Sequence, residues 1–382
     1  MKMIDYNDKK KLFIYYVFLI LFLSLTNQYF SYDQSLIFGG HDGKSYINIS
    51  DNFPNITDHK TPVIHSERFF FYYIFGFISK SLNLDIYNVY RFFVFCILVL
   101  INFFLILIFK SRKVDLNTTL IFLSLINLNP YISRFYIAVP TIINDLIFIF
   151  GLTLFVYSLE NNKTKILISS LIILFFSRQT SIAIILSLIL TKFIYREKFN
   201  LNNNKIFLIC LLFSIIYLIN HQYASLAENF GGDWGSLNMR LFGFFTQEYS
   251  IKQKVLFLML PALSFFPLIL YFILFRKPKN INPIFPHKPI YFLYFLICLI
   301  IISQPILSGV LVSNKNVIRL TTLSYILTLF LFLDSTILRE IKNKTLITFF
   351  YIFIILWSLH PTFSNITFFK SISVLLNKNL IN

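Results

Sequence analysis

Long, mainly apolar runs recur along nearly the whole chain, and they constrain its fold more than any other feature. About 20 apolar residues let an α-helix cross a bilayer, and ranges approaching or exceeding this length are Leu12–Phe30, Phe92–Phe109, Val139–Leu159, Val255–Phe275, Ile290–Val312 and Leu320–Leu333. Of the 382 residues, 57% are hydrophobic and 13% are charged, whereas soluble domains carry about 25% charged residues. The runs therefore predict an all-α, polytopic integral membrane protein.

Basic residues indicate how the chain is oriented. They concentrate in short segments between the apolar runs, at 2–11, 110–113, 163–165, 192–205, 276–288 and 339–344. Loops rich in Lys and Arg lie on the cytoplasmic side of a membrane, so we expect a cytoplasmic N-terminus. The net charge of +17 is spread over these segments and does not form one basic patch. No nucleic-acid partner is expected.

Alternation between the two sides predicts about eleven crossings. We expect them near 12–30, 87–109, 117–131, 139–159, 165–177, 180–195, 205–221, 253–275, 289–312, 318–338 and 345–360. Residues 31–86 then form a first external loop, in which the short segment 69–82 is predicted to be an interfacial helix. Residues 1–382 are expected to be one transmembrane domain with no separate soluble domain.

Polar residues in or beside the apolar runs fall mostly on the external side, and charged groups at membrane depth usually serve a function. Asp42 stands in the segment GGHDGKSYINIS, whose glycines allow a tight backbone beside a ligand. A carboxylate just above the bilayer can act as a general base or hold a divalent metal. The competing interpretation is a solvated loop acid or an Asx turn.

Arginines follow at later external positions. Arg178 lies in SRQT between two apolar runs that are shorter than a crossing, so it either lines a polar cavity or extends to the surface. Arginine binds phosphate through paired donors. Asn316 and Arg319 are three residues apart, on one face of a helix start that favours anions. They are equally compatible with a helix-end anchor.

Four further residues are candidates for the same external face. Arg134 and Asp145 flank Pro140, and we expect either an ion pair at the rim of a cavity or a structural role. Asp233 and Trp234 lie in a glycine-rich loop, where the aromatic ring would cover a sugar or lipid head, or anchor the loop at the membrane interface.

A metal site is not expected from the histidines. His41, His59 and His65 share the first external loop, but their spacing matches no regular ligand pattern, and a metal requires both ligand number and geometry.

The layout resembles the GT-C superfamily of membrane glycosyltransferases, in particular bacterial members that use polyprenyl-phosphate sugars. The resemblance rests on HDGKSYINIS after the first apolar run, on P-x-x-x-S-E-R at 62–68, on SRQT at 177–180 and on NVIR at 316–319. Asp42 holds the position of the catalytic aspartate in that family's first external loop.

The resemblance implies transfer of a sugar from the lipid donor to a glycan, lipid or protein acceptor. The reaction would take place on the external or periplasmic face of a bacterial inner membrane. Asp42 would be the general base, Arg178 and Arg319 would bind the donor phosphate, and Arg68 and Tyr46 would contribute to the substrate site. No second acidic motif is evident, which leaves a divalent cation, Mg or Mn, open as a cofactor.

Two other functions use similar residues. A transporter or flippase for lipid-linked sugars would line its conduit with the same arginines, but internal repeats typical of transporters are not evident. An O-antigen-type polymerase is expected to concentrate arginines in a late external loop, whereas the loop at 222–252 holds only Arg240 and Lys252. A purely structural or assembly role is a further alternative.

Overall fold

The computed structural model describes residues 6–29, 41–57, 61–199, 201–227, 251–275, 288–307, 314–332 and 344–363. These ranges are predominantly helical and contain no β-strand, which confirms the expected all-α class. In chain order the helices are α1 (Tyr6–Tyr29), α3 (His41–Asn52), α4 (Val63–Ser66), α5 (Phe69–Leu82), α6 (Ile86–Ser111), α7 (Leu116–Asn127), α8 (Ser133–Ala138), η1 (Pro140–Ile142), α9 (Ile143–Glu160), α10 (Thr164–Ser177), η2 (Gln179–Ser181), α11 (Ile182–Tyr195), η3 (Arg196–Lys198), α12 (Asn203–Leu226), α14 (Ile251–Phe275), α15 (Pro289–Leu307), α16 (Asn314–Thr322), α17 (Tyr325–Phe332) and α18 (Lys344–Phe363).

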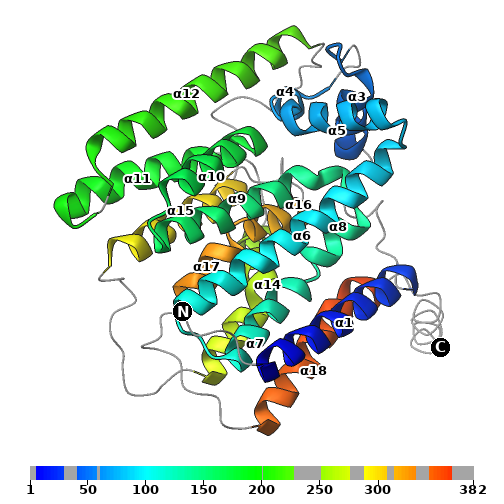
Figure 1. Cartoon of the computed structure of the whole chain (residues 1–382), viewed down its shortest axis with the longest axis vertical. Helices are drawn as coiled ribbons and strands as arrows, with labels where there is room; N and C mark the ends of the chain where they lie inside the picture. Colours follow the sequence, from blue (N-terminus) through cyan, green and yellow to red (C-terminus); the bar gives the residue numbers. More distant parts are fainter. Residues whose placement is uncertain are drawn as a thin grey trace.

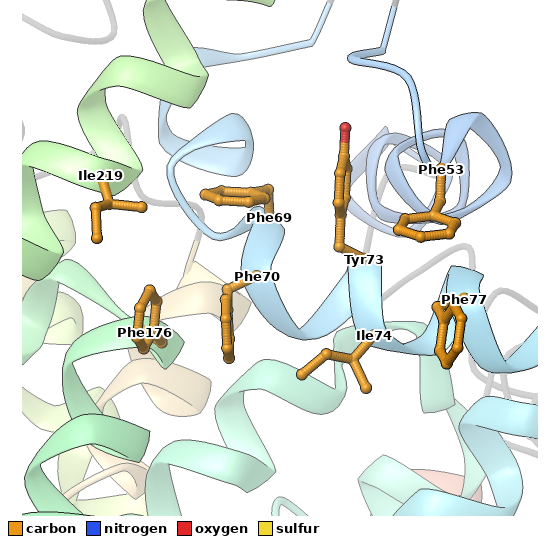
Figure 2. A pocket seen from close by; sticks show the side chains of 8 residues that line it. All are labelled: Phe53, Phe69, Phe70, Tyr73, Ile74, Phe77, Phe176 and Ile219. Carbon is orange, nitrogen blue, oxygen red and sulfur yellow. The ribbon is translucent and has the colours of Figure 1, made fainter.

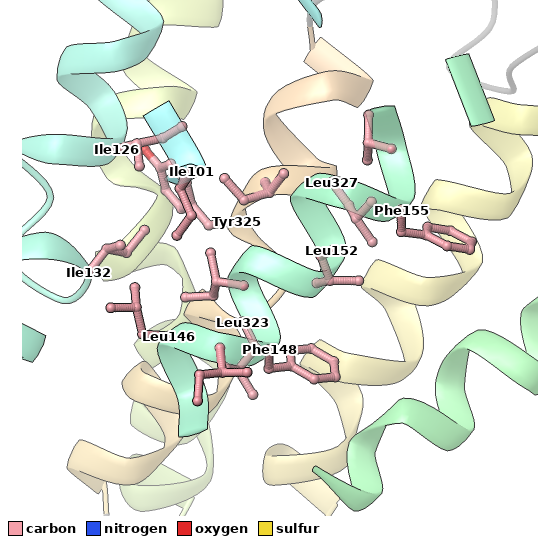
Figure 3. Packing of buried hydrophobic residues seen from close by; sticks show 14 of the residues in the cluster. Ile101, Ile126, Ile132, Leu146, Phe148, Leu152, Phe155, Leu323, Tyr325 and Leu327 are labelled. Carbon is pink, nitrogen blue, oxygen red and sulfur yellow. The ribbon is translucent and has the colours of Figure 1, made fainter. Parts of the chain in front are cut away.

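Helix α9 forms the centre of the bundle and packs against α6, α10 and α17 (Figure 1). Between Asp145 in its first turn and Glu160 at its end, its sequence is mainly apolar on every face, which is the pattern of a helix surrounded by other helices. Figure 3 shows Leu146, Phe148, Leu152 and Phe155 of α9 within the buried cluster. The two ends of this buried helix therefore hold fixed positions, and side chains of neighbouring helices lie around them.

Four helical segments within the described ranges are long and apolar enough to cross a membrane. They are α6, the combined η1 and α9 segment Pro140–Glu160, α12 and α15. The other ranges expected to cross also contain helices, several of them shorter than a crossing. The number of about eleven crossings therefore stays a prediction.

The segment expected as one crossing at 318–338 is divided between α16 and α17. Backbone bonds from Leu323 to Leu320 and from Ser324 to Thr321 join residues three apart, at 3.3 and 3.1 Å, and tighten the turn. The hydroxyls of Thr321, Thr322 and Ser324 bond to carbonyl oxygens three residues earlier. Such side-chain bonds compete with regular helix pairing, which explains a break that the apolar pattern did not predict.

The segment predicted as an interfacial helix at 69–82 coincides with α5. It ends at Asn83, whose left-handed backbone (φ 50°) is a common helix terminator. Helix α6 begins directly afterwards, because the Asp85 side chain accepts hydrogen bonds from the backbone N–H groups of Tyr87 and Asn88. Helix α5 packs against α3 and α6; its position at a membrane interface stays a prediction.

Asp42 lies in the first turn of α3 and not in a glycine-rich loop, which corrects the expected local backbone around Gly43. Two glycines let α3 approach its neighbours closely. A Cβ on Gly43 would lie 2.7 Å from the Thr141 hydroxyl oxygen, and one on Gly76 would lie 2.2 Å from the carbonyl oxygen of Ser50. Helix α3 is therefore held between η1 and α5, which brings Asp42 beside the start of α9.

Candidate functional site

Six charged or titratable side chains from distant parts of the sequence meet at the end of the bundle where α9 begins. They come from α3, α4, the two-residue link between α4 and α5, the first turn of α9, the break after α10, and α16. Asp42, His65, Arg68, Asp145, Arg178 and Arg319 form this group, which we call the α9-start cluster.

A continuous chain of ion pairs joins four members of the α9-start cluster. Asp42 Oδ2 lies 3.5 Å from Arg319 Nη1, and Arg319 Nε lies 3.3 Å from Asp145 Oδ2. Asp145 Oδ1 accepts from Arg178 Nη1. Asp145 therefore bridges the two arginines, and Asp42, Arg178 and Arg319 lie in one group.

Solvent exposure differs sharply among the four side chains that these ion pairs join. The side chain of Asp42 is 26% exposed, whereas those of Asp145, Arg178 and Arg319 are 1%, 3% and 8% exposed. Buried charges need a partner, since removing an ion from water costs several kcal/mol. Asp42 is thus the carboxylate that a substrate can reach, and the buried groups surround it from within the protein.

Arg68 is a buried cation whose hydrogen bonds go to neutral side chains. Its Nη1 donates to the Tyr46 hydroxyl at 2.8 Å, and its Nε donates to Gln179 Oε1 at 3.1 Å. None of the ion pairs in the described ranges involves Arg68. The α9-start cluster therefore holds three arginines against the two carboxylates of Asp42 and Asp145, which favours binding of an anion.

His65 lies against Asp42 on the side away from Arg319. The two atoms are His65 Nε2 and Asp42 Oδ1, 3.5 Å apart. The imidazole packs on the Tyr46 ring at a centroid distance of 4.9 Å, and Tyr46 stacks on Tyr72 at 4.4 Å. The Tyr72 hydroxyl donates to the Thr141 carbonyl oxygen at 2.9 Å, so aromatic packing connects α3, α5 and η1 beneath the carboxylate.

Burial and neighbouring charges set the ionisation of this pair. Burial is the largest influence on His65, and with the nearby arginines it lowers the pKa to about 4 although the charge of Asp42 opposes it. For Asp42 burial raises the pKa, but the charges of Arg319 and Arg68 and the hydrogen bond from Arg319 outweigh it and hold the pKa below its ordinary value. At neutral pH the carboxylate is ionised and the imidazole neutral, so the arginines supply the positive charge.

Several buried polar atoms around the α9-start cluster have no hydrogen-bond partner within the described ranges. They are His65 Nδ1, Tyr136 Oη, Asn144 Oδ1 and Arg178 Nε. The Asn144 amide nitrogen does donate to the Arg68 carbonyl oxygen, at 3.1 Å. A buried donor or acceptor without a partner costs about 1–3 kcal/mol, so the site retains capacity to bind a polar ligand.

An apolar groove lies beside the α9-start cluster. It has a volume of about 520 Å³ and is lined by Phe53, Phe69, Phe70, Tyr73, Ile74, Phe77, Phe176 and Ile219 (Figure 2). Phe70 and Phe176 stack at a centroid distance of 3.9 Å. Phe69 directly follows Arg68, and Phe176 precedes Arg178 by two residues, so the groove is connected to the α9-start cluster through both chain segments.

Arg134 does not pair with Asp145, so of the two alternatives expected from the sequence its contacts fit the structural role. Its guanidinium is fully buried and donates to the carbonyl oxygens of Ser358, at 2.6 Å, and Thr26, at 3.3 Å. Arg134 thereby links α8 to α18 and α1. The ion pairs of Asp145 within the described ranges go to Arg178 and Arg319 because both reach its end of α9.

The remaining sequence candidates have different outcomes. Tyr46 is fully buried within the α9-start cluster and bonded to Arg68. Asn316 lies on α16, but its side chain is outside what the structure describes, as are Asp233 and Trp234. The described part of the chain contains no group of three or more His, Cys, Asp or Glu side chains able to hold a metal ion.

Sequence reasoning missed His65, Gln179 and Glu67. The Gln179 amide nitrogen donates to Glu67 Oε2 at 2.8 Å and to the Ile64 carbonyl oxygen at 3.3 Å, which ties α4 to η2. The available signal was position: all three lie in the segments HSER and SRQT, which also contain Arg68 and Arg178. A metal-ligand spacing did not describe His65, because its neighbour is a single carboxylate, that of Asp42, which lies 23 residues earlier in the sequence.

Comparison of the chain with protein-family models, with curated proteins and with solved structures finds no match.

Proposed function

We propose that the chain is a multi-pass membrane glycosyltransferase. It would transfer a sugar from a polyprenyl-phosphate donor to an acceptor hydroxyl on the external or periplasmic face of a bacterial inner membrane. The observation that carries the proposal is the α9-start cluster: one accessible, ionised carboxylate backed by three buried arginines that outnumber the carboxylates around them.

Asp42 and the three arginines of the cluster each have a role in this reaction. Asp42 takes the proton from the acceptor hydroxyl as its oxygen forms a bond to the anomeric carbon of the sugar. The bond between that carbon and the phosphate oxygen breaks, and the phosphate leaves with the electron pair. Arg319, Arg178 and Arg68 stabilise the negative charge that develops on it. Attack opposite the leaving group inverts the configuration of the sugar carbon.

The apolar groove supports a lipid donor in particular. A donor of this kind has a phosphate at the end of a long apolar chain, and the groove begins one residue from Arg68. Side chains of Phe70, Ile74 and Phe176 would contact the chain while the arginines hold the phosphate. A soluble sugar nucleotide has no apolar segment that would use this groove.

The proposal is tested in proteoliposomes with polyprenyl-phosphate sugars and envelope glycan or lipid fractions as acceptors. We expect sugar transfer with release of polyprenyl phosphate. Asp42→Asn should lower the rate by about 10²–10⁴-fold, the usual range for loss of a general base. Asp51→Asn is the matched control, because Asp51 is an exposed acid on the same helix.

Two outcomes would reject the proposal. One is full transfer activity in Asp42→Asn. The other is a wild-type protein that moves the intact lipid-linked sugar across the bilayer without transferring it, which would identify a transporter.

A further inference from the structure

Asp42 has a second close contact whose chemistry differs from that of the arginines. Resting on the proposed role of Asp42 as the base, we propose that His65 is its positioning residue: a neutral imidazole whose Nε2–H holds carboxylate oxygen Oδ1 while Arg319 holds Oδ2. Each carboxylate oxygen thus has its own neighbour, at 3.5 Å in both cases.

The backbone around His65 is braced on several sides, so the imidazole is well placed to fix a neighbour. Its N–H donates to the Pro62 carbonyl oxygen at 2.8 Å, and its own carbonyl accepts from Arg68 N at 3.0 Å. The hydroxyls of Thr61 and Ser66, on either side of it, bond at 2.6 Å. The amide of Gln179 reaches the preceding carbonyl, that of Ile64, at 3.3 Å.

The proton on the ring must lie on Nε2. An ionised carboxylate only accepts hydrogen bonds, so the nitrogen that faces Asp42 has to be the donor. The other nitrogen, Nδ1, has no partner within the described ranges, and a neutral imidazole carries one proton. Burial and the charges of Arg68, Arg178 and Arg319 favour the neutral ring, against the charge of Asp42.

A neutral partner solves a problem that the arginines create. Arg319 contacts the carboxylate and Arg68 acts on it electrostatically, and a paired arginine contact would engage both oxygens at once. The imidazole donates a hydrogen bond to Oδ1 without adding charge, so the carboxylate keeps a fixed orientation toward the acceptor hydroxyl. Misplacement of a reacting group by about 1 Å can cost on the order of 100-fold in rate.

The first test needs no substrate. The full-length protein, labelled with ¹⁵N-histidine in lipid nanodiscs, is studied by NMR between pH 5 and 8, and the His65 signals are assigned from their loss in His65→Gln. We expect a neutral Nε2–H tautomer across this range and a shift of its Nε2 signal in Asp42→Asn. A Nδ1–H tautomer, or titration near pH 6.5, would overturn the inference.

The second test separates positioning from folding. Glutamine places its amide nitrogen at the distance of Nε2 along the side chain, whereas asparagine places it at the distance of Nδ1. We expect His65→Gln to keep most of kcat, and His65→Asn to lower kcat by up to about 100-fold with little change in KM for the donor. His221→Gln is the control, because His221 faces Glu67 at 3.7 Å but is 59% exposed.

The two proposals fail in different ways. If the wild-type protein transfers no sugar, the glycosyltransferase proposal fails while the NMR test still decides the role of His65. If transfer requires Asp42 but His65→Asn has the wild-type kcat, the role of His65 is rejected and the proposed function stands.

Discussion

Ion pairs mark both ends of α9, and the two ends differ in how their charges are balanced. Asp145 lies at the first turn and Glu160 at the last, 15 residues apart, which is about 22 Å along a helix. At the far end Arg112 makes a two-pronged contact with Glu160, and the Tyr294 hydroxyl donates to the same carboxylate at 3.3 Å. At this end of α9, one cation therefore balances one anion.

Aromatic side chains complete the pair at the far end. The Arg112 guanidinium lies 4.9 Å from the ring centroid of Phe330 and 5.5 Å from that of Tyr291. These contacts join α6, α9, α15 and α17.

The α9-start cluster contrasts with this pair in holding three arginines against two carboxylates, a partly exposed acid and several unpaired polar atoms. Balanced charges indicate a structural link, whereas unbalanced charges next to an accessible carboxylate indicate a binding site.

Removing Asp145 should have the largest effect on folding. Asp145→Ala leaves Arg178 and Arg319 together without their shared carboxylate, and breaking a buried pair in this way costs about 3–5 kcal/mol. Reversible unfolding in mixed micelles measures the loss. A second replacement, Arg178→Gln, should recover part of it by removing one uncompensated charge. A cost below that of Asp51→Ala would show that the α9-start cluster does not contribute to folding.

Arg68→Gln should weaken ligand binding and cost less folding stability than Asp145→Ala. Its hydrogen-bond partners Tyr46 and Gln179 are neutral, and Asp42 and Asp145 keep their ion pairs with Arg319 and Arg178. A hydrogen bond to a charged group contributes about 1.5–3 kcal/mol, so affinity for polyprenyl phosphate should fall by roughly 10- to 100-fold. Titration in nanodiscs measures this affinity. Equal binding by wild type and Arg68→Gln would remove Arg68 from the anion site.

Arg112→Gln should show the opposite pattern. It leaves the Glu160 carboxylate without its cation, at a cost on the order of 1–2 kcal/mol, while polyprenyl phosphate binding stays at the wild-type level. Unfolding and binding are measured on the same preparation as for Arg68→Gln. A loss of binding in Arg112→Gln would mean that the two ends of α9 are not functionally distinct.

The last expected effect is on the pH dependence of stability. Because the folded-state pKa of His65 is about 4 and an unfolded histidine titrates near 6.5, the unfolded state binds the extra proton between these values. Stability should therefore fall as pH decreases from about 6.5 to 4, by at most about 1.4 kcal/mol per pH unit from this group. The lowered pKa of Asp42 adds a loss of the same sign below about pH 4.

Unfolding of wild type and His65→Gln at pH 7 and pH 5 measures the contribution of His65. The difference between the two proteins should be larger at pH 7 than at pH 5. His221→Gln should follow the wild-type curve. A pH dependence unchanged by His65→Gln would place the ring in contact with water, where its pKa is ordinary.

Some elements followed directly from local patterns. The apolar runs predicted helices throughout, and the range predicted for the short helix at 69–82 coincides with α5. The short runs on either side of Arg178 predicted a helix break there, and the structure has an extended backbone at that residue (φ −156°, ψ 145°). These features depend on residues that are neighbours in the sequence, so periodicity and hydropathy describe them.

Which charged residues pair with one another depended on tertiary packing instead. Arg134 and Asp145 are close in sequence, yet Asp145 pairs with Arg178 and Arg319, from segments 33 and 174 residues away. His65 lies beside Asp42 because α3 and α4 pack together, a contact without sequence periodicity. Local chemistry alone determined that the chain is helical and carries charged groups among apolar runs. Only the three-dimensional packing of α3, α4, α9 and α16 decided which charges meet, because a buried charge pairs with whatever the fold brings within reach.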